Sequence, residues 1–268
     1  MSSIDQLFQR LSVRHRAALI PFVPAGDPDL NFTVQLLQAV AKAGADIIEI
    51  GFPFSDPIAD GPVIQASYTR ALNNHVKVRD IFNSIQKLTS QAQWEVPLVA
   101  MVSYSIMWRT GLATFLDEAK AAGFSGIIVP DLPVEEAGEC FRLASERQVD
   151  LILLLTPTTP TDRIQKIVRL CSGFVYCVSD VGITGEKNKM PVTLPEYLAH
   201  IRTFTKLPLC LGFGISSAGQ IQELKSLADG LIVGSALVRR LEHAAQDRTS
   251  TLESIASFVR QLASPLHC

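Results

Sequence analysis

Three acidic residues stand close together in the segment 47–62, which reads IIEIGFPFSDPIADGP. Glu49 interrupts an apolar run typical of a strand buried on both faces, whereas Asp56 and Asp60 follow in a loop containing proline and glycine. A carboxyl group in such a strand is costly unless it is paired, hydrogen-bonded or protonated. Carboxylates at the carboxyl end of one strand favour acid–base catalysis. The alternative is a structural ion pair for Glu49 and turn-capping roles for Asp56 and Asp60.

Glycine-rich turns follow the last two apolar runs, in GFGISS at 212–217 and VGSALV at 233–238. Glycine lets the backbone approach an anion closely, and free N–H groups at a helix start attract phosphate. Ser235, directly after Gly234, would add its N–H and hydroxyl. The turns therefore predict a phosphate site that needs no basic residue, although tight turns are the alternative. The polar stretch 182–191, GITGEKNKMP, predicts a mobile lid over that site.

Composition predicts a soluble protein and gives no argument for nucleic acid or a membrane as partner. The 268 residues are 47% hydrophobic and 19% charged, with a formal net charge of -2. The amino-terminal segment is too polar for a signal peptide, and no apolar run approaches the length of a membrane span. The five cysteines are scattered without a metal-ligand spacing, so we expect reduced thiols, a cytoplasmic location and no metal.

Eight apolar runs of strand length alternate with amphipathic segments along the chain. The runs lie at 18–23, 46–52, 97–104, 126–130, 150–155, 174–179, 208–213 and 230–235, and the helical segments at 30–43, 112–122, 134–147, 161–170, 194–205 and 217–228. A further helix at 236–262 is expected to break at 247–251. An extra amino-terminal helix, with Ile4, Leu7, Phe8 and Leu11 on one side, is expected to cover one end of the fold.

This alternation predicts an α/β fold, a (β/α)8 TIM barrel that forms a single domain over residues 1–268. A doubly wound sheet is the alternative, but the turn after the first run, PAGDP, lacks the GxGxxG fingerprint. In a barrel the chemistry belongs at the carboxyl ends of the strands, where the acidic loop and the glycine-rich turns both fall.

Longer motifs follow the same order from the first strand to the last: PFVPAGDPD, ADIIEIGFPFSDPIADGPVIQ, VPDLPVEE, TPTTPTDRI, SDVGITG, LGFGISS and IVGSALV. On these motifs the chain resembles the tryptophan synthase alpha subunit family over essentially its whole length, and EIGFPFSDPIADGP is a highly specific string. The resemblance implies a lyase of tryptophan biosynthesis that cleaves indole-3-glycerol phosphate to indole and glyceraldehyde 3-phosphate, without metal or organic cofactor.

The resemblance also implies roles for individual residues. Glu49 resembles the family's proton shuttle, acid first and then base, and Asp60 resembles the carboxylate that accepts the indole N–H. Thr184 resembles the lid residue that holds Asp60, and Asp131 matches an acidic position that we expect to support or cap a loop. The candidates for the indole-binding wall are Phe22, Ile64, Met101, Ile128, Tyr176 and Phe213, and those for phosphate are Gly185, Phe213, Gly214, Gly234 and Ser235.

Asp56 and Pro57 match the part of the acidic loop that faces a beta subunit in the family. The resemblance therefore implies a tryptophan synthase beta subunit as partner, in an alpha2beta2 heterotetramer. Three places depart from the usual pattern: Pro24 stands where threonine is common, Ser103-Tyr104-Ser105 where Tyr-x-Asn is common, and Glu186-Lys187-Asn188 where arginine is frequent.

Three other functions remain as alternatives. The chain could be a stand-alone, indole-releasing lyase, or a catalytically weak partner that mainly activates a beta subunit. It could also be another phosphate-binding barrel, such as a phosphosugar isomerase or an aldolase. A Schiff-base aldolase would need a lysine at a strand end, and none of the predicted strand ends carries one.

Overall fold

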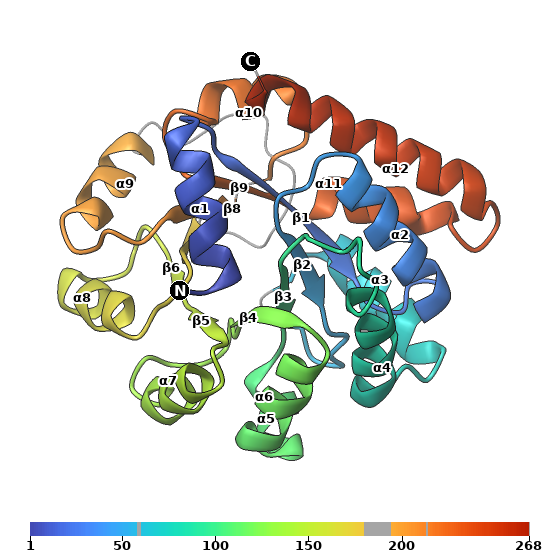
Figure 1. Cartoon of the computed structure of the whole chain (residues 1–268), viewed down its shortest axis with the longest axis horizontal. Helices are drawn as coiled ribbons and strands as arrows, with labels where there is room; N and C mark the ends of the chain where they lie inside the picture. The colour runs from blue at the N-terminus through green and yellow to red at the C-terminus, as the bar shows by residue number, and fades with distance from the viewer. Residues whose placement is uncertain (58–59, 180–193, 213, 268) are drawn as a thin grey trace.

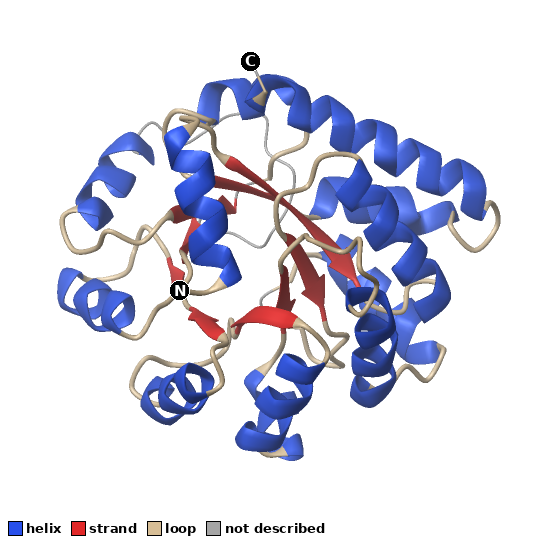
Figure 2. Ribbon diagram, viewed as in Figure 1, coloured by secondary structure: helices blue, strands red, loops and turns tan. Residues whose placement is uncertain are grey.

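A closed ring of parallel strands lies at the centre of the molecule (Figure 2). The computed structural model describes residues 1–57, 60–179, 194–212 and 214–267. The strands are β1 (Ala18–Pro24), β2 (Ile48–Gly51), β3 (Leu98–Met101), β4 (Phe124–Ile128), β5 (Asp150–Ile152), β6 (Leu154–Leu155), β7 (Val175–Val178), β8 (Leu209–Gly212) and β9 (Gly230–Val233). Their order is β5-β4-β3-β2-β1-β9-β8-β7-β6, and neighbouring strands in this order are parallel.

The fifth predicted strand, residues 150–155, is divided between two neighbours. Its first part, β5, pairs with β4, and its second part, β6, pairs with β7. Between them, the Leu153 N–H donates to Cys171 Sγ at 3.1 Å instead of to a strand. Because β5 and β6 are joined through this one residue, the sheet closes on itself. The predicted TIM barrel is confirmed, with its fifth strand in two pieces, while the single-domain organisation stays a prediction.

Helices surround the outside of the ring, apart from α1, which lies across one end (Figure 1). Among the described residues they are α1 (Ser3–Val13), α2 (Leu30–Lys42), α3 (Pro62–Asn73), α4 (Val78–Thr89), α5 (Tyr104–Thr110), α6 (Leu112–Ala121), α7 (Ala137–Glu146), α8 (Thr161–Arg169), α9 (Leu194–Arg202), α10 (Ala218–Leu224), α11 (Ser235–Val238) and α12 (Arg248–Ala263), with short 3-10 turns at Arg239–His243 and Ser264–Leu266. The expected break near residue 247 is confirmed, since Asp247 caps α12 by accepting from the Ser250 N–H. The pair α3 and α4, between β2 and β3, was not among the predicted helices.

The amino-terminal helix α1 covers one end of the ring, as expected (Figure 1). Ser2 and Asp5 form a capping box that starts the helix, and its buried face carries Ile4, Leu7, Phe8 and Leu11. This face packs on inward-pointing residues of the strands; the Phe8 and Phe174 rings, for example, lie 6.1 Å apart. Because Phe174 precedes β7, α1 covers the amino-terminal end of the barrel. The opposite end is left for chemistry.

Because side chains alternate along β2, the carboxyl group of Glu49 points into the ring. Ile48 and Ile50 belong to the apolar layer between the strands and the helices, whereas Ile47 belongs to the cluster inside the ring. Glu49 and Gly51 share the inward face with Ile47, because strand side chains alternate. In the ladder, Glu49 stands beside Phe22 of β1 and Val99 of β3.

Candidate active site

The Glu49 carboxyl lies inside the barrel, near its carboxyl end, with almost no access to solvent. The residue is 1% exposed, and its Oε2 atom has no hydrogen-bond partner within the described part of the chain. Burial, with a smaller contribution from the charge of Asp60, raises the pKa of Glu49 from 4.5 to about 8. The side chain is therefore protonated near neutral pH, which is how a buried, unpaired carboxyl avoids the cost of a bare charge.

Asp60 reaches the same place from the loop that follows β2. Its backbone is held on both sides: the Asp60 N–H donates to the Pro57 carbonyl at 3.0 Å, and the Gln65 side chain donates to the Asp60 carbonyl at 2.7 Å. Burial raises the pKa of the Asp60 carboxyl from 3.8 to about 6. The two carboxyl groups interact electrostatically, so ionised Asp60 favours the protonated form of Glu49.

Three aromatic rings, from β1, α3 and β7, lie close to this carboxyl pair, and two glycines make room for them. A Cβ atom on Gly51 would lie 2.4 Å from Phe22 Cζ and 2.4 Å from the Tyr68 hydroxyl, and one on Gly212 would lie 2.5 Å from the Tyr176 hydroxyl. Only glycine leaves room for such close approach. The rings of Phe22 and Tyr176 therefore lie against the carboxyl ends of β2 and β8, on the side where the carboxyl pair is found.

The other predicted wall residues have different positions around the same end. Ile64 is a buried residue of α3, in one apolar cluster with Phe22. Met101 ends β3, beside Gly51 of β2 and Ile128 of β4. Phe213 lies outside the described residues, as do Thr184 and Gly185.

Sequence reasoning missed Tyr68, which is 3% exposed on α3. The available signal was its spacing of four residues from Ile64, which puts both side chains on one face of the helix. That pattern indicates burial, but it does not show that the ring reaches the end of β2.

The predicted phosphate turns lie side by side, because β8 pairs with β9 and Gly212 stands beside Ile232. Gly234 is the N-cap of α11, and a Cβ there would meet nothing within 4 Å, so the backbone borders open space. The N–H groups of Ser235 and Ala236 have no acceptor among the described residues and stand where a helix leaves its first donors unpaired. Gly214 follows β8 in the neighbouring turn.

Asp131 holds the loop after β3. Its carboxylate accepts from the Ser103 hydroxyl at 2.6 Å and from the Tyr104 N–H at 2.8 Å. Ser103 in turn caps α5 by accepting from the Ser105 N–H. This is the supporting role expected of Asp131, and it makes Ser103 part of the same capping arrangement.

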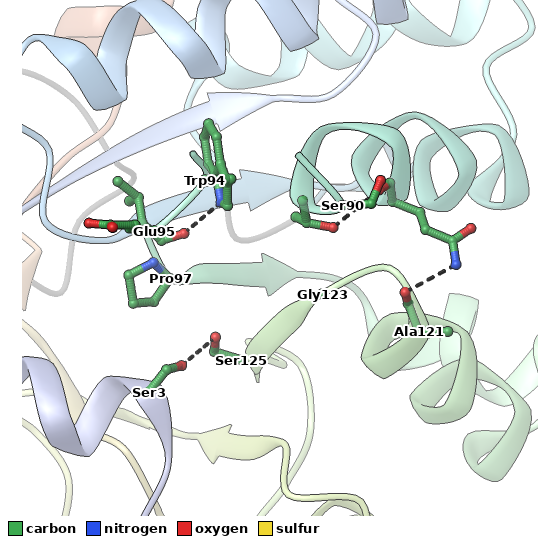
Figure 3. A pocket seen from close by; sticks show the side chains of 11 residues that line it. Ser3, Ser90, Trp94, Glu95, Pro97, Ala121, Gly123 and Ser125 are labelled. Atoms are coloured by element: carbon green, nitrogen blue, oxygen red, sulfur yellow. Dashed lines mark hydrogen bonds between the residues drawn. The ribbon is translucent and has the colours of Figure 1, made fainter. Parts of the chain in front are cut away.

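Pockets at the other end of the barrel are lined in part by polar groups that pair with each other within the protein. One, of about 430 Å³, lies beside the amino-terminal ends of β3 and β4 (Figure 3). In it the Ser3 and Ser125 hydroxyls bond each other at 2.7 Å, and the Trp94 indole N–H donates to the Val96 carbonyl at 2.8 Å. We therefore assign the candidate active site to the end that carries Glu49 and Asp60.

Comparison with known proteins gives one family. The sequence model described as "Tryptophan synthase alpha chain" matches residues 8–267. The chain is 46% identical to the tryptophan synthase alpha chain of Rhodopirellula baltica over 94% of its own length and 91% of that protein, and 43% identical to that of Alkaliphilus metalliredigens over 98% and 97%. The chain belongs to the tryptophan synthase alpha chain family.

Solved structures of this family have the same fold. A Mycobacterium tuberculosis tryptophan synthase chain superposes with a TM-score of 0.90 at 32% identity, covering 100% of this chain and 99% of that one. The Legionella pneumophila tryptophan synthase alpha chain gives 0.90 at 31% identity, over 100% and 98%. The family membership predicted from the sequence is confirmed, and with it the assignment as a carbon–carbon lyase. Among the described helices of this family member, none is long and apolar enough to cross a membrane.

The raised pKa of Glu49 makes a prediction about stability. The folded protein holds a proton on Glu49 up to about pH 8, whereas the unfolded chain releases it near 4.5. The free energy of unfolding should therefore fall as pH rises through this window and level off above it. Replacing Glu49 with glutamine should remove this loss, which is on the order of 5 kcal/mol at high pH.

Urea unfolding at several pH values between about 5 and 9 measures this effect for the wild type and Glu49→Gln. Glu95→Gln, the same change at an exposed carboxyl, is the control and should follow the wild-type curve. Parallel curves for the wild type and Glu49→Gln would contradict the burial of an unpaired carboxyl.

Proposed function

We propose that Glu49 and Asp60 carry out the retro-aldol cleavage of indole-3-glycerol phosphate to indole and glyceraldehyde 3-phosphate. The observation that carries this assignment is the pair itself: one buried, unpaired carboxyl whose pKa is raised to about 8 beside a second whose pKa is about 6. Two carboxyl groups with separated pKa values can serve as an acid and a base at the same pH.

In the first step Glu49 gives its proton to C3 of the indole ring. The ring then carries positive charge, and its N–H becomes more acidic. Asp60, ionised above about pH 6, accepts a hydrogen bond from this N–H and stabilises the charge. In a site shielded from water this stabilisation is stronger than in solution.

In the second step Glu49, now a carboxylate, takes the proton of the hydroxyl on the adjacent side-chain carbon. The carbon–carbon bond breaks, the aldehyde of glyceraldehyde 3-phosphate forms, and the electron pair returns to the ring to give neutral indole. Glu49 ends the cycle protonated, as it began, so the reaction needs no other proton donor.

The remaining predicted residues would bind the two ends of the substrate. Phe22, Ile64, Met101 and Tyr176 supply apolar surface for the indole, with Phe213 added by the family resemblance. Gly214, Gly234 and Ser235 would bind phosphate through backbone N–H groups, and Gly185 is a further candidate. Thr184 stays the predicted partner of Asp60. These roles rest on position and on the family.

The first test is an assay of indole release from indole-3-glycerol phosphate. Glu49→Gln keeps the shape of the side chain but cannot exchange the proton, so kcat should fall by about 10³-fold or more with little change in substrate binding. Asp60→Asn should lower kcat by about 10²–10³-fold because the charge on the ring loses its counter-ion. Ser235→Ala should cost less than about tenfold, since the backbone donors survive. Full activity of Glu49→Gln would end this mechanism.

The pH dependence of kcat/KM is the second test. Activity needs Asp60 ionised and Glu49 protonated, so the profile should be a bell with an acid limb near 6 and a basic limb near 8. Because the two groups interact, these are the apparent pKa values of the pair. A profile that keeps rising above pH 8 would be incompatible with Glu49 as the acid.

We further propose that the chain works with a tryptophan synthase beta subunit in an alpha2beta2 complex. Asp56 is exposed on the acidic loop, and Pro57 is tied by its carbonyl to the Asp60 N–H, so a partner bound there would touch the backbone that carries Asp60. Mixing the purified chain with a beta subunit should raise the rate of indole formation. Asp56→Ala should weaken that activation more than the basal rate. An unchanged rate in both proteins would favour a stand-alone lyase instead.

A further inference from the structure

We infer that Tyr68 is a positioning residue of this site: its hydroxyl, fixed over Gly51 at the end of β2, hydrogen-bonds to the Asp60 carboxylate through one water molecule. The inference deepens the proposed lyase function and rests on it for its catalytic meaning. It stands on the position, burial and pairing of one side chain that the mechanism above does not use.

The position of the Tyr68 hydroxyl follows from the close approach at Gly51. The oxygen lies 2.4 Å from the point where a Cβ on Gly51 would be, and Gly51 shares the inward face of β2 with Glu49. Tyr68 therefore reaches from α3 to the end of β2, and its hydroxyl interacts electrostatically with Asp60 and Glu49.

Tyr68 is 3% exposed, and no side-chain hydrogen bond joins its hydroxyl to another described residue. Polar groups at such a site are paired with protein, water or ligand in native proteins. Among the described titratable groups, the two carboxyl groups that act on Tyr68 are Asp60 and Glu49, and either could accept from its hydroxyl.

Electrostatics distinguishes between the two carboxyl groups. Among the described residues, the titratable groups in electrostatic contact with Asp60 are Glu49, Tyr68 and Tyr176. Asp60 acts more strongly than Glu49 on the pKa of Tyr68, whereas Glu49 acts more strongly than Asp60 on that of Tyr176. Tyr68 thus lies on the Asp60 side of the pair. Burial keeps the pKa of its phenol well above the usual value, so it is a neutral donor at working pH.

The helix that carries Tyr68 is held firmly on both sides of this residue. The buried Asp27 carboxylate accepts from the Ser67 hydroxyl at 2.5 Å and from the Arg70 Nε and Nη2 atoms at 2.9 and 2.6 Å. Asp27 is 1% exposed, and such bidentate, charge-assisted bonds are strong. Because α3 also begins directly after Asp60 and Gly61, the donor and its acceptor are fixed relative to each other.

A hydrogen bond from Tyr68 favours the ionised form of Asp60 and opposes the effect of burial. It therefore keeps Asp60 able to accept the indole N–H near neutral pH, where Glu49 is still protonated. Tyr68 does not touch the reacting carbon in this account; it acts through Asp60.

The test is Tyr68→Phe, which keeps the ring against Gly51 and Phe22 and removes only the donor. Carboxyl-labelled aspartate, with the Asp60 signal assigned by its loss in Asp60→Asn, allows the Asp60 pKa to be read by NMR titration. We expect the Asp60 midpoint to move upward by about one pH unit in Tyr68→Phe, the effect of one lost hydrogen bond to a charged group. The acid limb of kcat/KM should move with it, and the basic limb should stay.

Tyr197→Phe is the matched control, because the Tyr197 hydroxyl on α9 is also buried and has no partner among the described residues. It should leave the Asp60 titration and both limbs in place. An unmoved Asp60 midpoint in Tyr68→Phe, or a uniform loss of activity with both limbs unmoved, overturns the inference. A wild-type protein that releases no indole would refute the proposed roles of Glu49 and Asp60 instead, and the NMR titration would still decide on Tyr68.

Discussion

The burial of the Glu49 carboxyl next to Asp60 is the constraint on which the rest of this structure depends. An ionised carboxylate at this point would lack both water and a cationic partner among the described residues, so the group holds its proton at neutral pH. That state costs stability at higher pH, and a protein optimised for stability alone would carry an apolar residue here. The cost is understandable if the proton is used, because a carbon acid–base step needs a group that can give a proton and take it back.

The two ends of the barrel are built for different purposes. At the amino-terminal end, α1 fills the ring with Ile4, Leu7 and Phe8, and nearby polar groups such as Ser3 and Ser125 pair with each other. At the carboxyl end, two glycines replace side chains, which lets aromatic rings approach the carboxyl pair. The amino-terminal end stabilises the fold by burying apolar surface, whereas the carboxyl end holds the two carboxyl groups among apolar side chains.

Much of this arrangement could be predicted from the sequence because it depends on short-range patterns. The alternating runs indicated a barrel, the spacing of Ile4, Leu7, Phe8 and Leu11 indicated a covering helix, and one glutamate in a buried strand indicated the acid. The division of the fifth strand at Leu153 could not be predicted, since it reflects which neighbours the strand meets on either side. The position of Tyr68 could not be predicted for a related reason. Its spacing from Ile64 indicates a buried helix face, but the rotation of α3 against the barrel decides where its hydroxyl lies. The roles of Thr184, Gly185 and Phe213 stay predictions.

The protonation state of Glu49 in the resting protein tests this account most directly. Infrared difference spectroscopy between the wild type and Glu49→Gln, recorded near neutral pH in the absence of substrate, separates the carbonyl band of a protonated carboxyl from the bands of a carboxylate. The account predicts a protonated-carboxyl band that belongs to Glu49 and disappears as pH rises through about 8. A carboxylate signal from Glu49 at neutral pH would contradict it, because the residue could then not begin the reaction as an acid.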